Sequence, residues 1–321
     1  GADYFYEEIR KKLFLNYGAE KLYSEGLIIK TSLNTDLQNL AEESLINGII
    51  QYDKNQGWRG VVGNLKEYDI EFENIIKKIK NPFPNKWLLA KIDKVDAVKL
   101  LLSNKNLKKI EINLNLQPNK WLVNKKFKKN DLLFIEKLNS SYVVRQIPNV
   151  NGAIVVIEPY SGDILAMSGG FSFNLSQFNR STQAKRQPGS AFKPFVYISA
   201  LKHGYSPSTL ILDAPYVIDQ GPGLPKWKPA NYSDEFYGLT TMRTGIEKSR
   251  NLMTIRLANK IGVDTILSLA KDFKIDKYLD KNMSMSLGSG LVTLIDLTNA
   301  YGIIANGGKE IKPNIIKSIY S

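Results

Sequence analysis

The stretch that decides the fold is RQPGSAFKPF, residues 186–195. In it, Ser190 and Lys193 have the spacing that places a hydroxyl and an amine on one face of a helix, within reach of each other. The amine can take the hydroxyl proton if burial or neighbouring cations keep it neutral, so the pair predicts a serine nucleophile with a lysine base. Pro188 and Gly189 bring the chain tightly into the helix start, where free N–H groups and the helix dipole favour an oxyanion.

The Ser-x-x-Lys spacing is weak evidence by itself, because the chain contains it again at Ser199–Lys202 and at Ser268–Lys271. Ser199 lies roughly half a turn round the same helix from Ser190, at about 100° per residue, and should face away. No turn signal precedes Ser268. Context therefore selects Ser190, and we interpret the other copies as ordinary helix surface.

A second element should relay the proton, and Ser249-Arg250-Asn251 supplies a hydroxyl and an amide two positions apart. Such a pair can face a shared cleft only from a turn or loop, and GIEKSRNLMTIRL places it between helical stretches. Ser-x-Asn also occurs at 32–34 and at 172–174, so spacing alone does not choose among the three. The position after the nucleophile, between two helices, favours Ser249 and Asn251.

The composition excludes several other chemistries. With no Cys, the chain has no thiolate nucleophile, disulfide or Cys-based zinc site. His203 is the only histidine, so a multi-His metal site is impossible, and a Ser-His-Asp triad would have to use this residue. Because Gly204 follows it as a helix-end signal, favourable charge at a helix terminus is the preferred interpretation of His203.

The net charge of +13 raises the question of an anionic partner. Most basic residues are Lys scattered over the first half of the chain, so we do not expect nucleic-acid binding, and an anionic envelope surface is at least as good a partner. No apolar run of about 18 residues occurs, so no membrane span is expected within these residues. The chain begins abruptly in helical pattern, and we expect it to be an excised piece of a longer protein.

Three segments differ in pattern. Residues 1–55 predict a helix near the start, a strand in GLIIKTSL, and a second helix capped by Asn34 or Thr35. We expect one face of that second helix to carry Leu37, Leu40, Ala41 and Leu45.

Residues 56–146 contain short β-type runs, and such spacing suggests a small barrel or sandwich. From 147, GAIVVIEPYSGDILAMSGG predicts two strands about a turn at 159–163, and helices are expected afterwards. The β-type runs are WLLAKIDKV, AVKLLLS, KKIEINLNL, DLLFIEKL and SYVVRQI, and the expected helices cover 190–203, 240–261 in pieces, 263–273 and 293–306.

Longer stretches around these motifs resemble the transpeptidase domain of class A penicillin-binding proteins. The opening stretch YGAEKLYSEGLIIKTSLNTDLQNLAEESL resembles the segment that joins the glycosyltransferase and transpeptidase domains in that family. The resemblance covers nearly the whole chain. It is carried by FSFNLSQFNRSTQAKRQPGSAFKPFVY, LDAPYVIDQGPG, WKPANYSDEFYG, IEKSRNLMTIRLA and SMSLGSGLVTLIDLTNAYGIIANGG.

The resemblance implies an α/β penicillin-binding transpeptidase fold, in which an antiparallel sheet is flanked by helices. Residues 1–55 would be the linker, 56–146 an inserted OB-like β-barrel, and 147–321 the transpeptidase domain. It implies a location on the periplasmic side of the bacterial inner membrane, with the anchor outside this chain. The parent protein would also be a peptidoglycan glycosyltransferase, and a regulatory envelope protein could dock on the OB-like domain.

The resemblance also implies roles for the motif residues. Ser190 would attack the D-Ala-D-Ala carbonyl of a peptidoglycan stem peptide, with Lys193 as general base. Ser249 would pass a proton to the leaving D-Ala, and Asn251 would bind the substrate amide and Lys193. An amine of a second stem peptide would resolve the acyl-enzyme, β-lactams would acylate Ser190, and no metal or organic cofactor is implied.

Two features of the resemblance stay open. The family's third motif, Lys-[Ser/Thr]-Gly, completes the oxyanion hole, and residues 1–321 do not contain it. We therefore expect a truncated, weakly active or inactive fragment, since losing one oxyanion donor costs about 10²–10³ in rate. Aromatic residues of the 227–238 stretch could line the cleft, although such clusters are more often core: Trp227, Tyr232, Phe236 and Tyr237.

Two alternative functions, other than transpeptidation, are also compatible with the sequence. The chain could be a non-catalytic envelope scaffold in which residues 1–146 dock a partner. It could also be a penicilloyl-accepting sensor or a β-lactamase relative, which shares Ser-x-x-Lys. The linker and barrel upstream argue against a stand-alone hydrolase.

Overall fold

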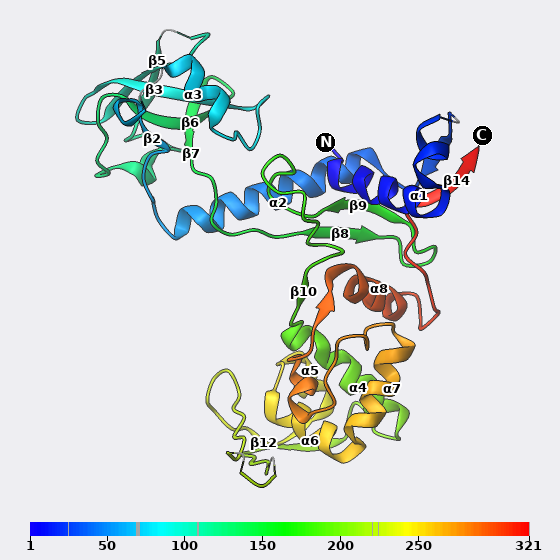
Figure 1. The fold of residues 1–321 in the computed structure, drawn as a ribbon. Helices are drawn as coiled ribbons and strands as arrows, with labels where there is room; N and C mark the ends of the chain where they lie inside the picture. The colour runs from blue at the N-terminus through cyan, green and yellow to red at the C-terminus, as the bar shows by residue number, and fades with distance from the viewer. Residues whose placement is uncertain (25, 69–70, 108, 220, 224, 321) are drawn as a thin grey trace.

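The computed structural model describes residues 1–24, 26–68, 71–107, 109–219, 221–223 and 225–320. Figure 1 shows three regions: a β-rich module, a layer of paired strands with the long helices α1 and α2, and a helical lobe. Among the described residues, no helix is both long and apolar enough to cross a membrane.

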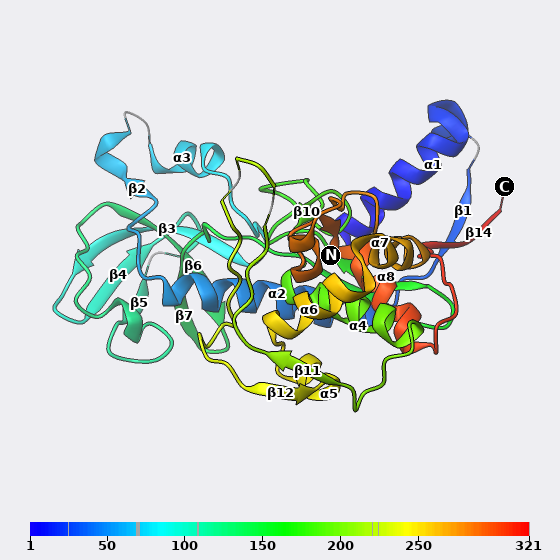
Figure 2. The same ribbon diagram turned by 90° about the horizontal axis from the view of Figure 1, so that it is seen from below.

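The described part of residues 1–55 forms two helices and a strand. Helix α1 spans Asp3–Ser24, strand β1 spans Ile28–Thr31 and helix α2 spans Thr35–Asn55. Asn34 caps α2 by accepting a hydrogen bond from the N–H of Leu37, as one of the two predicted caps. Strand β1 pairs antiparallel with the C-terminal strand β14, Ile316–Tyr320 (Figure 1; Figure 2).

The predicted inner face of α2 is wrong at Leu40, whose side chain is 61% exposed. The buried face passes through Gln38 and Ala41 instead. The Gln38 amide donates to the carbonyl of Met167 at 3.1 Å and accepts from its N–H at 2.8 Å. A polar residue therefore occupies the helix face that the apolar pattern assigned to leucines, because it pairs with the backbone of a strand.

That strand belongs to the antiparallel pair β8 (Ile154–Ile157) and β9 (Ile164–Ser168), which matches the two predicted strands. Helices α1 and α2 lie against β9, and α8 (Leu294–Ala305) lies against β8 (Figure 1). The pair is thus flanked by helices, as the expected α/β fold requires. Its core includes residues from the first and last parts of the chain: Phe5, Ile9, Leu13, Ile164, Met167 and Ile315.

The β-rich module forms one antiparallel sheet in the order β2-β6-β3-β4-β5, with β7 also paired to β6. Strands β3 and β6 lie where their β-type runs predicted them; β3 alternates in part between buried and half-buried residues, whereas β6 buries the five consecutive residues 131–135. Strand β5 lies near β7, but no hydrogen-bonded pair joins them in the described part, so closure into a barrel stays a prediction. The strands are β2 Gly63–Asn64, β3 Trp87–Val95, β4 Lys99–Ser103, β5 Ile110–Asn113, β6 Asp131–Leu138 and β7 Ser141–Arg145, with helix α3 at Phe72–Lys78 and 3₁₀ turns at Leu65–Glu67 and Lys120–Leu122.

A buried carboxylate ties this module to the end of α2. Asp53 accepts two hydrogen bonds from Arg59, at 2.8 and 2.9 Å, one from Gln146 and one from the N–H of Asn149. Burial raises the pKa of Asp53, but these hydrogen bonds outweigh it and hold the pKa below its ordinary value. The chain therefore enters and leaves the module at one fixed point.

The helical lobe is built around an apolar core that includes Phe192, Phe195, Met253, Leu257 and Met285. Its helices match the expected ranges. They are α4 Lys193–Lys202, α5 Met242–Glu247, α6 Asn251–Ile261 and α7 Val263–Asp272, with 3₁₀ turns η3 at Gly189–Phe192 and η4 at Met283–Leu287, and strands β10 Lys185–Arg186, β11 Leu210–Asp213, β12 Gly238–Thr241 and β13 Val292–Thr293. Strands β10 and β13 pair with each other, as do β11 and β12.

Candidate active site

Ser190 lies in the 3₁₀ turn η3, immediately before α4, and its side chain is exposed. Lys193 is the first residue of α4, and its N–H donates to the carbonyl of Ser190. In a 3₁₀ turn, residues three apart eclipse each other, so the two side chains leave the same side of the turn. The predicted helix start is therefore correct, but its first turn is tighter than an α-helix.

Lys193 is 1% exposed, and its ammonium group has three acceptors. Nζ donates to the carbonyl of Ser249 at 2.6 Å, to Ser249 Oγ at 3.0 Å and to Asn251 Oδ1 at 2.6 Å. Burial lowers the pKa of Lys193 to about 8. At pH 7 the amine is therefore neutral in about a tenth of molecules, a far larger fraction than for an exposed lysine.

Ser249 occupies the bend between α5 and α6 with φ of +52°, a left-handed conformation that is uncommon for a residue with a side chain. The bend turns both Ser249 Oγ and Asn251 Oδ1 toward Lys193. The predicted location between two helices is correct. Lys193, Ser249 and Asn251 thus converge. Ser190 lies one turn before Lys193, and among the described residues its Oγ makes no hydrogen bond to Lys193 Nζ.

The competing motif copies have structural roles. Ser199 is buried and donates to the carbonyl of Phe195 within α4. Ser32 donates to the carbonyls of Ile164 and Asn314. Ser172 donates to the carbonyl of Pro82. His203 follows α4 and donates from Nδ1 to the carbonyl of Ser199 at 2.8 Å, in agreement with its predicted place at a helix end.

Gly189 and Gly288 pack against each other beside the turn that carries Ser190. The N–H of Gly189 donates to the carbonyl of Gly288 at 3.2 Å. Gly288 has φ of +80°, and a Cβ built on it would lie 2.1 Å from the carbonyl oxygen of Gly189. Only glycine fits both the backbone conformation and this approach. No local pattern marks Gly288 for this role, although it lies in SMSLGSG, part of a stretch that carries the resemblance.

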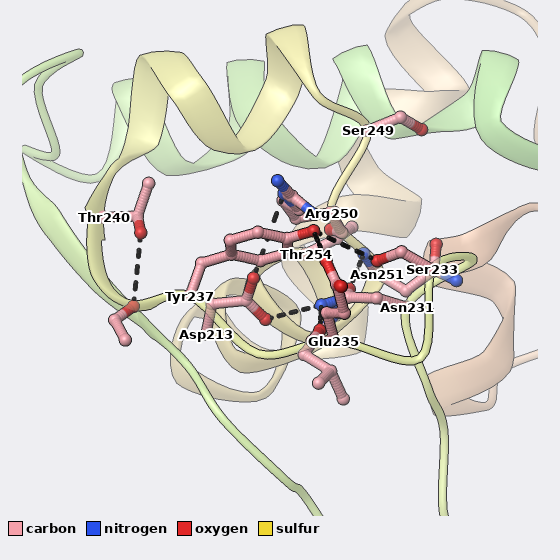
Figure 3. Close-up of polar contacts among 12 residues, drawn as sticks. Asp213, Asn231, Ser233, Glu235, Tyr237, Thr240, Ser249, Arg250, Asn251 and Thr254 are labelled. Carbon is pink, nitrogen blue, oxygen red and sulfur yellow. Dashed lines mark hydrogen bonds and ion pairs between the residues drawn. The ribbon is translucent and has the colours of Figure 1, made fainter.

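The four predicted aromatic residues are not core. Tyr232 and Phe236 are exposed, and Trp227 is half-buried and pairs through its backbone with Ile218. Tyr237 lies beside the Ser249–Asn251 bend, where its ring faces the Arg250 guanidinium at 3.4 Å from the ring centroid (Figure 3). Their contribution to a substrate cleft stays a prediction.

Residues 152–321 match the family model described as penicillin binding protein transpeptidase domain. The chain belongs to the penicillin-binding protein transpeptidase family. It is 41% identical to penicillin-binding protein 1A of Rickettsia prowazekii over 331 aligned positions, which cover 99% of this chain and 41% of that protein. It is 30% identical to penicillin-binding protein 1A of Pseudomonas aeruginosa, covering 100% of this chain and 40% of that protein.

A solved structure of a penicillin-binding protein has the same fold as this chain. Penicillin-binding protein 1A from Haemophilus influenzae superposes with a TM-score of 0.91 at 28% identity, covering 99% of this chain and 48% of that one. The predicted family and fold class are therefore confirmed. The chain spans about two fifths of the length of the curated relatives named above.

Proposed function

We propose that this chain carries the acyl-transfer site of a peptidoglycan D,D-transpeptidase, with Ser190 as nucleophile. The observation that supports this most directly is the buried Lys193 amine, which leaves the same turn as the exposed Ser190 hydroxyl and contacts both Ser249 and Asn251. A serine becomes nucleophilic when an adjacent base takes its proton, and a lysine can do so when burial keeps part of it neutral. Membership of a transpeptidase family agrees with this chemistry.

In the proposed acylation, Ser190 Oγ attacks the D-Ala-D-Ala carbonyl while its proton moves to Lys193 Nζ. The first N–H groups of a helix have no intrahelical partner, so the N–H of Ser190 can stabilise the oxyanion. Collapse of the intermediate breaks the peptide bond, and the Ser249 hydroxyl, 3.0 Å from Nζ, passes a proton to the leaving D-Ala amine. The amine of a second stem peptide then attacks the acyl-enzyme carbonyl; the ester bond to Ser190 breaks, the cross-linking amide forms, and the proton lost by the amine returns to Ser190 Oγ through Lys193. β-Lactams would stop the cycle by acylating Ser190.

The wider setting follows as part of the proposal. The relatives are named penicillin-binding protein 1A, and we place this protein on the periplasmic side of the inner membrane. We also propose that the parent protein is bifunctional, with a peptidoglycan glycosyltransferase in addition to this domain. The β-rich module remains the candidate surface for a regulatory envelope partner.

The test is acylation by a fluorescent penicillin, followed by gel fluorescence, in the native protein that carries residues 1–321. Ser190→Ala should abolish labelling, whereas Ser268→Ala, at an exposed second copy of Ser-x-x-Lys, should label like the wild type. Equal labelling of Ser190→Ala and wild type would contradict the assignment. Residues 1–321 alone should label slowly, because they hold no Lys-[Ser/Thr]-Gly to supply further oxyanion stabilisation, and rapid labelling would refute that part.

A further inference from the structure

The support of the Ser249–Asn251 bend comes from a separate loop. Helix α6 begins at Asn251, and the residue in the N-cap position, Arg250, makes no side-chain cap hydrogen bond. Asn231 supplies the cap from the loop before β12: its Oδ1 accepts from the N–H of Asn251 at 2.9 Å and of Leu252 at 3.3 Å (Figure 3). These N–H groups would otherwise lack a partner in the first turn of the helix.

The orientation of the Asn231 amide is set by a buried carboxylate. Its Nδ2 donates to Asp213 Oδ1 at 2.8 Å and to the carbonyl of Glu235 at 2.9 Å. Asp213 is fully buried at the end of β11, and Asn231 is 4% exposed. All the partners of Nδ2 are acceptors and all those of Oδ1 are donors, so a flipped amide would lose every one of these hydrogen bonds.

The same loop also orients the Asn251 side chain. Asn251 Nδ2 donates to the carbonyl of Ala230 at 2.8 Å, which leaves Oδ1 to accept from Lys193 Nζ at 2.6 Å. Asn251 is therefore held at its backbone by Asn231 and at its side chain by the preceding residue of the loop. One contact to Lys193 is thus determined by residues that do not touch Lys193.

The guanidinium group of Arg250 partly balances the negative charge of the buried Asp213 carboxylate. Arg250 Nε lies 3.9 Å from Asp213 Oδ2, and the two atoms are buried without a hydrogen bond in the described structure. The guanidinium group of Arg250 is stacked on the ring of Tyr237 (Figure 3). The Asp213 carboxylate therefore has one strong hydrogen bond, the one from Asn231, and its orientation depends on that contact.

From this geometry we infer that Asp213 and Asn231 are positioning residues for acyl transfer: through the start of α6 they fix Asn251 against Lys193. The inference rests on the proposed function of Ser190 and Lys193. Neither residue touches the reacting atoms. Their effect is to pre-align the base, and misplacement of a catalytic group by about 1 Å can cost about 10² in rate.

Asn231→Asp is the informative single change. It keeps an oxygen to cap α6 but replaces the Nδ2 donor with a second carboxylate oxygen facing Asp213 Oδ1. We expect the acylation rate constant to fall by about 10–10². Asp213→Asn keeps an acceptor for Asn231 and should lose less. In the double variant Asp213→Asn/Asn231→Asp, an amide donor at 213 again faces a carboxylate acceptor at 231. The carbonyl of Glu235 still lacks its donor, so the double variant should recover part of the rate lost in Asn231→Asp.

Asn119→Asp in the β-rich module is the matched control. Asn119 is also a buried asparagine that bridges backbone groups, donating to the carbonyl of Tyr142 and accepting from the N–H of Val144. It should lower the melting temperature without changing the acylation rate constant of folded protein. If Asn231 has only a structural role, Asn231→Asp should behave like Asn119→Asp: the melting temperature falls and the acylation rate constant of folded protein does not change. In that case there is no loss of rate for the double variant to recover.

The measurements are the fluorescent-penicillin acylation rate constant, the melting temperature, and hydrogen exchange of the peptide that covers 250–255, all in the native protein. Asn231→Ala should accelerate exchange at the start of α6. If Ser190→Ala abolishes labelling while Asn231→Asp reacts at the wild-type rate, the inference is overturned and the proposed function stands. If Ser190→Ala labels normally, the proposed function fails, and unchanged exchange in Asn231→Ala would overturn the positioning role independently of activity.

Discussion

The acylation rate should rise with pH through the pKa of Lys193. Only the neutral amine can accept the proton of Ser190, and burial lowers the pKa of Lys193 to about 8. The neutral fraction is then about 0.1 at pH 7, about 0.5 at pH 8 and about 0.9 at pH 9. The rate constant should therefore increase about fivefold from pH 7 to pH 8 and less than twofold from pH 8 to pH 9.

The assay is stopped-flow or rapid-quench acylation by a fluorescent penicillin between pH 6 and pH 10, at constant ionic strength and below saturation. The midpoint is assigned to Lys193 with Ser249→Ala, which removes the Oγ acceptor at 3.0 Å but keeps the backbone carbonyl at 2.6 Å. Losing an acceptor disfavours the ammonium form, so the midpoint should move to lower pH. A rate that does not change between pH 7 and pH 9, or a midpoint near 10.5 as for an ordinary lysine, would refute the reasoning.

Three other variants and one control variant test the geometry. Lys193→Met should reduce acylation by about 10²–10⁴, the usual contribution of a general base, in the labelling assay; near-normal labelling would exclude its role. Gly288→Ala should slow acylation and lower the melting temperature because its Cβ would overlap the backbone of the nucleophile turn, whereas Gly307→Ala, with similar φ of +81° and open space, should affect only the melting temperature. Gln38→Leu should destabilise the fold by about 1–3 kcal/mol for each of the two Met167 backbone groups left unpaired, measured by denaturant unfolding; an unchanged midpoint would contradict this.

Local patterns predicted the individual elements well. The run WLLAKIDKV coincides with β3 and DLLFIEKL with β6, because short runs rich in large apolar residues between turn signals favour buried strands. The pairing of β1 with β14 could not be read in this way, since it joins residues at opposite ends of the chain. The inner face of α2 was misjudged for the same reason: the partner of Gln38 is the backbone of β9, which no local pattern reveals.

In the candidate site, too, local features could be predicted from the sequence and contacts between distant segments could not. Ser190 and Lys193 share one turn, so their spacing and the Pro188-Gly189 entry could predict that they lie together, while their roles stay a prediction. Ser249 required an argument from its place between helices, and the three contacts of Lys193 bear out its proximity. The sequence predicted the helix start but not its tight 3₁₀ turn or the close approach of Gly288, which comes from a distant segment of the chain.

Asp213 and Asn231 show why residues that contact the site only through other residues could not be predicted from the sequence. Each is an ordinary polar residue in its own segment, one at the end of a strand and the other in a loop. The two residues come together only in the fold, where β11, the loop before β12 and the start of α6 meet. There the Asn231 amide makes hydrogen bonds with the Asp213 carboxylate, one backbone carbonyl and two N–H groups of the helix. A buried polar group with every partner satisfied adopts a single orientation, and here that orientation leads directly to Lys193. Asp213 thus reaches Lys193 only through Asn231 and Asn251, a chain of contacts that no single segment of the sequence contains.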